Sequence, residues 1–228
     1  GQPEKHEPFH PVPEGFRHAA WNDLAAVEAA LAPEVGAILL EPLQGEGGVN
    51  PADAAFLQGA RRLCDERGIL LIIDEVQTGL GRTGEWFGFQ HAGIVPDMVT
   101  MAKGLGNGVP IGAVWATAEV AAAFGPGDHG STYAGQPLAA AGAREVLRIM
   151  EEMDAPRMAR ERGAELTGLL EALPGVSSVR GLGLLLGVEL EPMALEGRTA
   201  AEVARACLDA GLVVNGVTPT ALRLAPPM

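Results

Sequence analysis

Two short, wholly apolar runs that each end at an acidic residue constrain the fold of this chain more than any other feature. The first run is Ala37–Leu40, followed by Glu41, and the second is Ile69–Ile73, followed by Asp74. The residues from about 51 to 67 lie between them and have a helical pattern. An unbroken apolar run of this length is typical of a strand buried on both faces of a parallel sheet. The three segments therefore predict a strand–helix–strand unit.

The same alternation continues along the chain and predicts an α/β fold with a mostly parallel sheet. Two further strands are expected at Met98–Met101 and Ile111–Trp115. Two further helices are expected at Trp21–Leu31, with Asn22 as its cap, and at Ala118–Phe124. Ligands of such sheets bind at the carboxyl ends of the strands, so the residues after each apolar run are the candidates for a site.

After Gly130 the pattern changes to longer helices, which predicts a smaller α+β domain. The expected helices are Pro137–Ile149, Ala155–Leu173 and Thr199–Ala210, and the expected strands are Val176–Val179, Leu184–Leu190 and Leu212–Val214. We expect residues 1–140 to form the C-terminal half of a large domain. Residues 141–228 would form the small domain, which is incomplete.

The composition excludes several classes of function. Lys and Arg number 16 against 29 Asp and Glu, and the net charge of −13 argues against nucleic acid or a membrane surface as partner. No segment has the roughly 18 consecutive apolar residues of a membrane span. The two cysteines, Cys64 and Cys207, are interpreted as buried reduced thiols of a cytoplasmic protein. The histidines lack metal-ligand spacing, so no metal is expected. Prolines predict an irregular chain over residues 1–17.

The residues after the second and third apolar runs have the chemistry of a cofactor site. Asp74 and Val76 are two apart and share a face of the strand. Such a pair suits a flat heterocycle, because the carboxylate pairs with a ring N–H⁺ while the branched group packs on the ring; Gln77 can reach a ring oxygen. Lys103 lies among glycines, where it can form a Schiff base with an aldehyde cofactor. Plainer interpretations stay open: Asp74 caps a turn, and Lys103 is a solvated loop lysine.

Two glycine-containing turns are candidates for phosphate binding. Gly130–Tyr133 precedes a helix, and its backbone N–H groups and hydroxyls suit a phosphate oxygen. An ordinary helix-entry turn is the alternative. The turn at Gly45–Gly48 could belong to a nucleotide-binding module, although it lacks the spacing of a dinucleotide fingerprint and a P-loop lysine.

Five longer motifs carry a family resemblance. They are LEPLQGEGG (Leu40–Gly48), DEVQTGLGRTG (Asp74–Gly84), AKGLG (Ala102–Gly106), HGSTY (His129–Tyr133) and RLAPP (Arg223–Pro227). Together they resemble the class-III pyridoxal-phosphate (PLP) aminotransferases over nearly the whole chain. The resemblance implies a fold-type I PLP-dependent transferase, with a mostly parallel sheet in the large domain and a smaller α+β C-terminal domain. It also implies a homodimer with shared active sites.

The resemblance implies a role for each residue of the cofactor site. Lys103 would bind PLP covalently and then serve as the general base and acid. Asp74 would pair with the pyridine nitrogen and keep it protonated, so that the ring can take up electrons. Val76 would pack on the ring and Gln77 would hydrogen-bond its phenolic oxygen. Glu75 is grouped with these as a cofactor-binding residue.

Further residues match family positions for phosphate and substrate. Thr132 resembles a phosphate contact that reaches the neighbouring subunit's site, and Ser131 would lie near cofactor or substrate. Arg223 would bind the α-carboxylate of glutamate or 2-oxoglutarate. Glu46 would neutralise that arginine while the other substrate is bound. Glu41 belongs to the motif, but no role follows for it.

The implied reaction is transfer of the terminal amino group of N-acetylornithine to 2-oxoglutarate, as in arginine biosynthesis. The products are N-acetylglutamate semialdehyde and glutamate. Enzymes acting on ornithine, succinylornithine, 4-aminobutyrate or lysine-pathway amines share these motifs and are alternatives.

Several family features are missing from the sequence. Family chains carry a phosphate-binding Gly-Thr-x-Ala-Asn turn, a ring-stacking aromatic and a substrate arginine ahead of the matched region, and none occurs here. The first residue is Gly1, and the chain ends soon after Arg223. These features predict a fragment. A non-catalytic, dimerising remnant is the alternative if these 228 residues are the whole chain. At Asn107, Ala134 and Gln136 the sequence differs from the residues that are usual in the family, and these differences are small.

Overall fold

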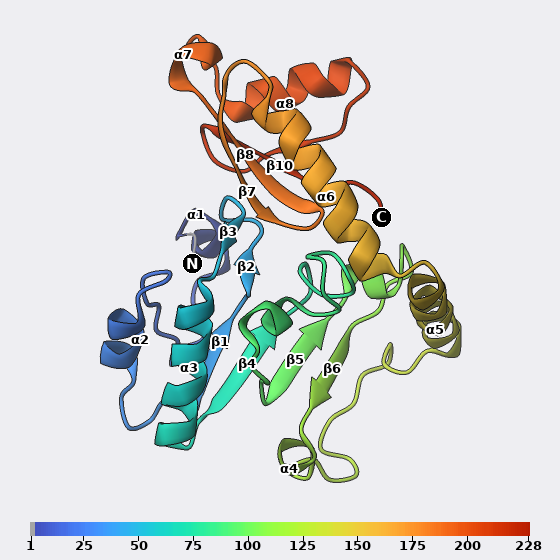
Figure 1. The fold of residues 1–228 in the computed structure, drawn as a ribbon. Coiled ribbons are helices and arrows are strands. Elements are labelled where there is room, and N and C mark those ends of the chain that lie inside the picture. The colour runs from blue at the N-terminus through green and yellow to red at the C-terminus, as the bar shows by residue number, and fades with distance from the viewer. Residues whose placement is uncertain (1–2) are drawn as a thin grey trace.

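The computed structural model describes residues 3–228, which form two four-stranded sheets connected by helices and by one hairpin (Figure 1). The first sheet has the strand order β1-β4-β5-β6. Its strands are β1 (Ala37–Leu40), β4 (Leu70–Asp74), β5 (Met98–Met101) and β6 (Ala113–Ala116). Strands β1, β4 and β5 are parallel, and β6 is antiparallel to β5. The expected mostly parallel sheet is therefore confirmed.

Helix α3 (Ala54–Arg67) covers the first sheet on the side of β1 and β4, and it lies alongside β1 in Figure 1. Helix α2 (Leu24–Ala30) packs against α3. Residues of α3 form the main core with Leu71 and Ile73, which are fully buried in β4. Helix α3 ends at Gly68, whose φ of 64° is a left-handed conformation that glycine adopts at little cost. The apolar run of β4 thus has the burial that its sequence predicted.

The cap of α2 differs from the sequence expectation. Asp23, not Asn22, is the N-cap, and its Oδ1 accepts a hydrogen bond from the backbone N–H of Ala26 at 2.9 Å. Asn22 has a φ of 57°, and its side-chain oxygen accepts the N–H of Asp53 at 2.9 Å. Its amide nitrogen donates to the carbonyl of Pro51 at 3.3 Å. Asn22 therefore ties the start of α2 to the segment that precedes α3.

The second sheet is antiparallel, with the order β7-β8-β10-β9. Its strands are β7 (Val176–Leu182), β8 (Leu185–Leu190), β9 (Asn215–Gly216) and β10 (Ala221–Leu224). The helices of this half are α5 (Pro137–Glu152), α6 (Ala155–Glu171), α7 (Pro192–Leu195) and α8 (Ala200–Asp209). The expected strand at Leu212–Val214 is wrong: Leu212 is tied to the end of α8 through its N–H, and Leu212 and Val213 are exposed.

The hairpin of β2 (Leu43–Gln44) and β3 (Asn50–Pro51) links the two sheets. It follows the carboxyl end of β1 and reaches β7 (Figure 1). Arg180 of β7 donates to the carbonyl of Gly48 at 2.6 Å and to that of Val49 at 3.1 Å. Val49 is fully buried against Leu43 and Leu185. This packing holds the tip of the hairpin against the second sheet.

The remaining elements are short. They are α1 (Pro3–His6), η1 (Glu7–Phe9), η2 (Gly88–Ala92), η3 (Lys103–Leu105) and α4 (Ala118–Ala121). The expected irregular chain over residues 1–17 therefore contains helical turns, because proline is tolerated in a first helical turn; Gly1 and Gln2 lie outside the described residues. Within residues 3–228, every helix is too short or too polar to span a bilayer. Cys64 is buried, whereas Cys207 is only half-buried.

Candidate active site

The carboxyl ends of β1, β4 and β5 bring three sequence motifs to one edge of the first sheet. Leu40 of β1 is opposite Ile73 of β4, so the next residues, Glu41 and Asp74, are neighbours. Asp74 is in turn opposite Thr100 of β5. Lys103 follows three residues after Thr100. The topology therefore places a lysine and two carboxylates at one end of adjacent parallel strands, where such sheets bind ligands.

The carboxylate of Asp74 is oriented by a backbone N–H group two residues further along the chain. Its Oδ1 accepts a hydrogen bond from the N–H of Val76 at 2.9 Å. Both residues are half-buried. An oriented carboxylate at a strand end can hold a proton on a nearby ring nitrogen.

Glu75 has its partners within the segment that follows β4. Its side chain is 1% exposed, and its carboxylate accepts the hydroxyl of Thr78 at 2.5 Å and the N–H of Phe89 at 2.9 Å. Burial raises the pKa of Glu75 above its usual range, against these hydrogen bonds, which lower it. These contacts fold residues 75–89 onto the strand end. A cofactor-binding role for Glu75 stays a prediction.

Lys103 is exposed and begins η3 with a φ of 43°. This left-handed conformation is uncommon for a residue with a side chain and points to a local constraint at the strand end. A hollow of about 430 Å³ adjoins it, lined by Lys103, Gly104, Asn107, Gly108, Val109, Pro110 and Ile111. Lys103 thus borders open space.

Glu46 and Arg223 form an ion pair between the hairpin and β10. Glu46 Oε1 lies 2.5 Å from Arg223 Nη1, and the arginine side chain is 12% exposed against 59% for the glutamate. Gln77 Nε2 donates to the same Oε1 at 3.5 Å. The hydrogen bond from Arg223 is the main cause that lowers the pKa of Glu46. The predicted pair is therefore brought together, beside a predicted cofactor residue.

Glu41, to which the sequence gave no role, belongs to the same cluster. Its carboxylate is half-buried, and its Oε2 accepts the N–H of Gly45 at 3.4 Å. Burial raises the pKa of Glu41, and the charge of Asp74 raises it further. The charge of Lys103 acts in the opposite direction and lowers the pKa of both Glu41 and Glu46. Glu41 and Glu46 therefore both lie within electrostatic reach of Lys103, and Glu41 lies within reach of Asp74 as well.

Ser131 and Thr132 lie outside this cluster. They belong to an exposed segment between α4 and α5, which runs beyond β6 in Figure 1. Within residues 3–228 their hydrogen bonds are local: Ser131 Oγ accepts the N–H of Tyr133, and the carbonyl of Thr132 accepts the side chain of Gln136. The structure of this single chain does not bring either residue to Lys103.

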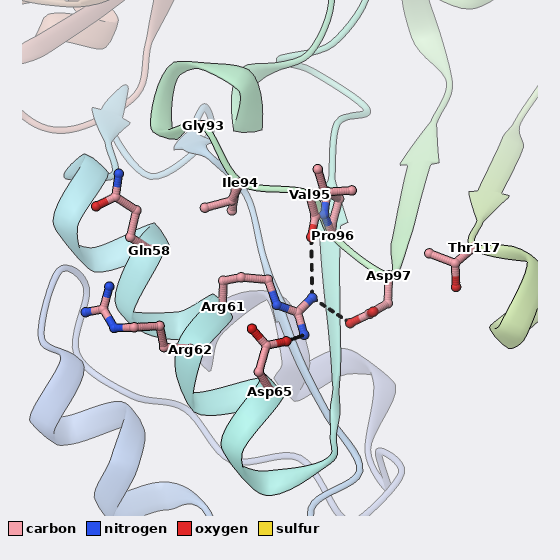
Figure 2. A pocket seen from close by; sticks show the side chains of 10 residues that line it. All are labelled: Gln58, Arg61, Arg62, Asp65, Gly93, Ile94, Val95, Pro96, Asp97 and Thr117. Atoms are coloured by element: carbon pink, nitrogen blue, oxygen red, sulfur yellow. Dashed lines mark hydrogen bonds and ion pairs between the residues drawn. The ribbon is translucent and has the colours of Figure 1, made fainter.

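A second hollow, of about 510 Å³, lies at the opposite end of the sheet between α3 and the start of β5 (Figure 2). Its central side chain is Arg61, which contacts Asp97 and Asp65, each at 2.7 Å. Asp97 also accepts the N–H of Leu71 at 2.7 Å. The guanidinium is therefore neutralised by two carboxylates and joins α3 to the strands, which is a structural role.

Known proteins resemble this chain along its whole described length. The profile of the family described as Aminotransferase class-III matches residues 3–228. The acetylornithine aminotransferase of Corynebacterium efficiens is 47% identical over all of this chain and 56% of its own length. Acetylornithine aminotransferase 1 of Bordetella pertussis is 47% identical over all of this chain and 58% of its own length. The chain thus spans a little more than half the length of these relatives.

Solved structures share the fold. The ornithine aminotransferase of Toxoplasma gondii superposes with a TM-score of 0.90 at 35% identity, over 98% of this chain and 54% of that protein. The N-acetylornithine aminotransferase of Stenotrophomonas maltophilia superposes with a TM-score of 0.81 at 38% identity, over 94% of this chain and 57% of that protein. The expected fold class is confirmed. Because the family profile covers residues 3–228, the chain belongs to the class-III aminotransferases.

Proposed function

We propose that this chain is the lysine-bearing part of a PLP-dependent aminotransferase that acts on N-acetylornithine and 2-oxoglutarate. The observation that carries the reaction class is the placement of Asp74 and Lys103 at the carboxyl ends of adjacent parallel strands. The relatives named acetylornithine aminotransferase, at 47% identity, support the choice of amino donor. The products would be N-acetylglutamate semialdehyde and glutamate.

The residues at the strand ends fit PLP. The side-chain oxygen of Gln77 is buried and has no hydrogen-bond partner within residues 3–228, so no bond within the chain fixes that end of the amide. The amide nitrogen, which is the end that can donate to a phenolic oxygen, makes a long contact of 3.5 Å with Glu46. The amide packs directly on Gly45, where a Cβ atom would lie 1.2 Å from that oxygen. A carboxylate, an amide and a lysine that borders open space are the groups that a pyridinium ring, a phenolic oxygen and an aldehyde require. A related structure, of the Toxoplasma gondii ornithine aminotransferase, is described as having partial occupancy of PLP at its active site.

Each residue would have a defined task. PLP supplies an electron-accepting ring when it is bound. Asp74 would hold a proton on the ring nitrogen, and its bond from Val76 fixes the direction of the carboxylate. Lys103 Nζ would remove the proton from the amine-bearing carbon of the substrate as general base. As general acid it would deliver that proton to the carbon on the other side of the nitrogen, which completes a 1,3-proton shift. Val76 would pack on the ring, and Gln77 would hydrogen-bond the phenolic oxygen.

Arg223 would give one site two substrate specificities. Its guanidinium can bind a carboxylate with two parallel hydrogen bonds. Glu46 occupies it in this structure, so its charge is neutralised while a donor without an α-carboxylate at that position is bound. When 2-oxoglutarate or glutamate enters, its α-carboxylate would replace Glu46 on the arginine. Glu46 is more than half exposed, so it can move away from the arginine into water.

The remaining assignments extend the proposal to the complete protein. Ser131 and Thr132 would contact cofactor or substrate across a homodimer interface, because their exposed segment does not reach the site within one chain. We propose a division into residues 1–140, part of the large domain, and 141–228, part of the small domain. The cytoplasm is the predicted compartment.

Steady-state kinetics of the complete protein test the proposal. With 2-oxoglutarate as acceptor, N-acetylornithine should give a kcat/KM at least about tenfold above those of ornithine, succinylornithine and 4-aminobutyrate, which one added hydrogen-bonded contact can produce. A preference for one of the other amines would leave the proposed reaction class unchanged and would identify that amine as the amino donor. If the protein neither binds PLP nor transfers an amino group, the non-catalytic, dimerising remnant describes it instead.

A further inference from the structure

Glu41 lies in the site without a task in the proposed reaction. It directly follows β1 and is the neighbour of Asp74, because Leu40 and Ile73 are opposite each other in the parallel pair. Its side chain is half-buried and turns back onto its own loop rather than into solvent. A half-buried carboxylate beside another carboxylate is costly to keep, so its contacts need an explanation.

The contact of Glu41 is with the backbone of the loop that carries Glu46. Oε2 of Glu41 accepts the N–H of Gly45 at 3.4 Å, four residues further along the chain. Gly45 is buried and directly precedes Glu46. It also forms the surface on which the amide of Gln77 packs, since a Cβ at this position would overlap that amide. One hydrogen bond therefore fixes a residue on which two site residues depend.

We propose that Glu41 is a positioning residue that holds Gly45, and through it places Glu46 against Arg223 and supports the amide of Gln77. The inference rests on the proposed function for its effect on substrates. Its structural part concerns only the chain itself. The useful property of Glu41 is its acceptor oxygen, which glutamine also has and methionine lacks. Glu41→Gln and Glu41→Met are therefore matched variants of similar length.

Hydrogen exchange of the complete protein without cofactor tests the structural part. In Glu41→Met, amides of residues 43–48 should exchange about tenfold faster, as expected from loss of a hydrogen bond. Amides of α3 should be unchanged, and Glu41→Gln should match the wild type. Glu41→Ala is a second variant without an acceptor, should Glu41→Met fail to fold. Unchanged exchange in the acceptor-free variant, or equal acceleration in Glu41→Gln, would overturn the proposal.

Single-turnover kinetics of the PLP-loaded protein test the effect on substrates. A loosened Glu46 leaves Arg223 more available to an α-carboxylate, so the ratio of the glutamate to the N-acetylornithine half-reaction rate should rise about fivefold in Glu41→Met. Glu46→Gln should shift the ratio in the same direction and further. Glu41→Gln should keep the wild-type ratio. Equal slowing of both half-reactions in Glu41→Met would overturn the positioning role. A wild-type protein that performs neither half-reaction would contradict the proposed function instead, and the exchange experiment would still decide the role of Glu41.

Discussion

Glu46 Oε1 and Arg223 Nη1 lie 2.5 Å apart although the two residues are 177 positions apart in the sequence. The pair connects the hairpin at the carboxyl end of β1 with β10, an inner strand of the second sheet. Arg223 is almost enclosed and Glu46 is open to water. This asymmetry makes the arginine the fixed member of the pair and the glutamate the member that can leave.

Substitution of the fixed member should separate substrate binding from cofactor binding. Arg223→Ala should raise the KM for 2-oxoglutarate about tenfold or more, because it removes charge-assisted hydrogen bonds to the α-carboxylate. The affinity for PLP, measured by fluorescence titration, should change little. The control is Arg205→Ala, whose side chain is 74% exposed on α8. Equal losses of PLP affinity and 2-oxoglutarate binding would contradict the assignment of Arg223.

A side chain at Gly45 should compete for space with Gln77, because the amide of Gln77 occupies the place of the Gly45 Cβ. Gly45→Ala should displace Gln77 and weaken PLP binding by about tenfold, the value of one hydrogen bond to an ionised oxygen. Gly47→Ala is the matched control in the same loop, since its added Cβ would lie no closer than 3.5 Å to a neighbouring atom. The dissociation constant for PLP should therefore be higher in Gly45→Ala than in Gly47→Ala. Similar values in the two variants would show that the position of Gln77 does not depend on Gly45.

Two glycines of α6 should respond in opposite directions. A Cβ on Gly163 would lie 2.1 Å from the carbonyl oxygen of Gly183, whereas a Cβ on Gly168 would meet nothing within 4 Å. Gly163→Ala should lower the free energy of unfolding by about 1–3 kcal/mol through overpacking. Gly168→Ala should raise it by about 0.5–1 kcal/mol through helix propensity. Urea denaturation of both variants measures the difference, and destabilisation of equal size would contradict this close approach of α6 and the β7–β8 turn.

Glu75 should make stability depend on pH in a defined direction. Because burial raises its pKa in the folded protein, the folded state binds the proton more tightly than the unfolded chain. Its contribution to stability is complete below the ordinary glutamate pKa and is lost as the pH rises through the raised value. Glu75→Gln removes this titration. The stability of the wild type relative to Glu75→Gln, measured by urea denaturation, should therefore fall as the pH rises above the ordinary glutamate pKa. A constant or rising difference would contradict a raised pKa.

The strands of the first sheet could be predicted because each is a local signal. Ala37–Leu40 and Met98–Met101 are apolar runs whose bounds the structure reproduces. Strand β10 (Ala221–Leu224) has the same length of four residues, but Arg223 interrupts its apolar run, and no strand was predicted there. The run Leu212–Val214 is apolar enough for a strand but ends a helix instead. Composition alone cannot separate these two outcomes.

Site residues that belong to a local motif could be predicted from the sequence. Contacts that depend on the three-dimensional fold were harder to predict. Asp74 and Lys103 follow apolar runs, so the topology of a parallel sheet already places them together. The contact of Glu46 with Arg223 follows from no local pattern and was expected only through family resemblance. The hydrogen bond from Gly45 to Glu41 depends on how one loop folds back, which no motif describes. Sequence therefore identified the groups, and the structure supplied their dependence on one another.

The most direct test of the account is the position at which PLP attaches. This sequence contains two lysines, Lys5 and Lys103, and peptide mapping separates a label on Lys103 from a label on Lys5 or on any other lysine of the complete protein. After incubation of the complete protein with PLP and reduction with borohydride, peptide mapping should find the label on Lys103, and Lys103→Ala should lose it. A label on Lys5 or elsewhere, or a Lys103→Ala protein that keeps the label, would contradict the assignment of the active site.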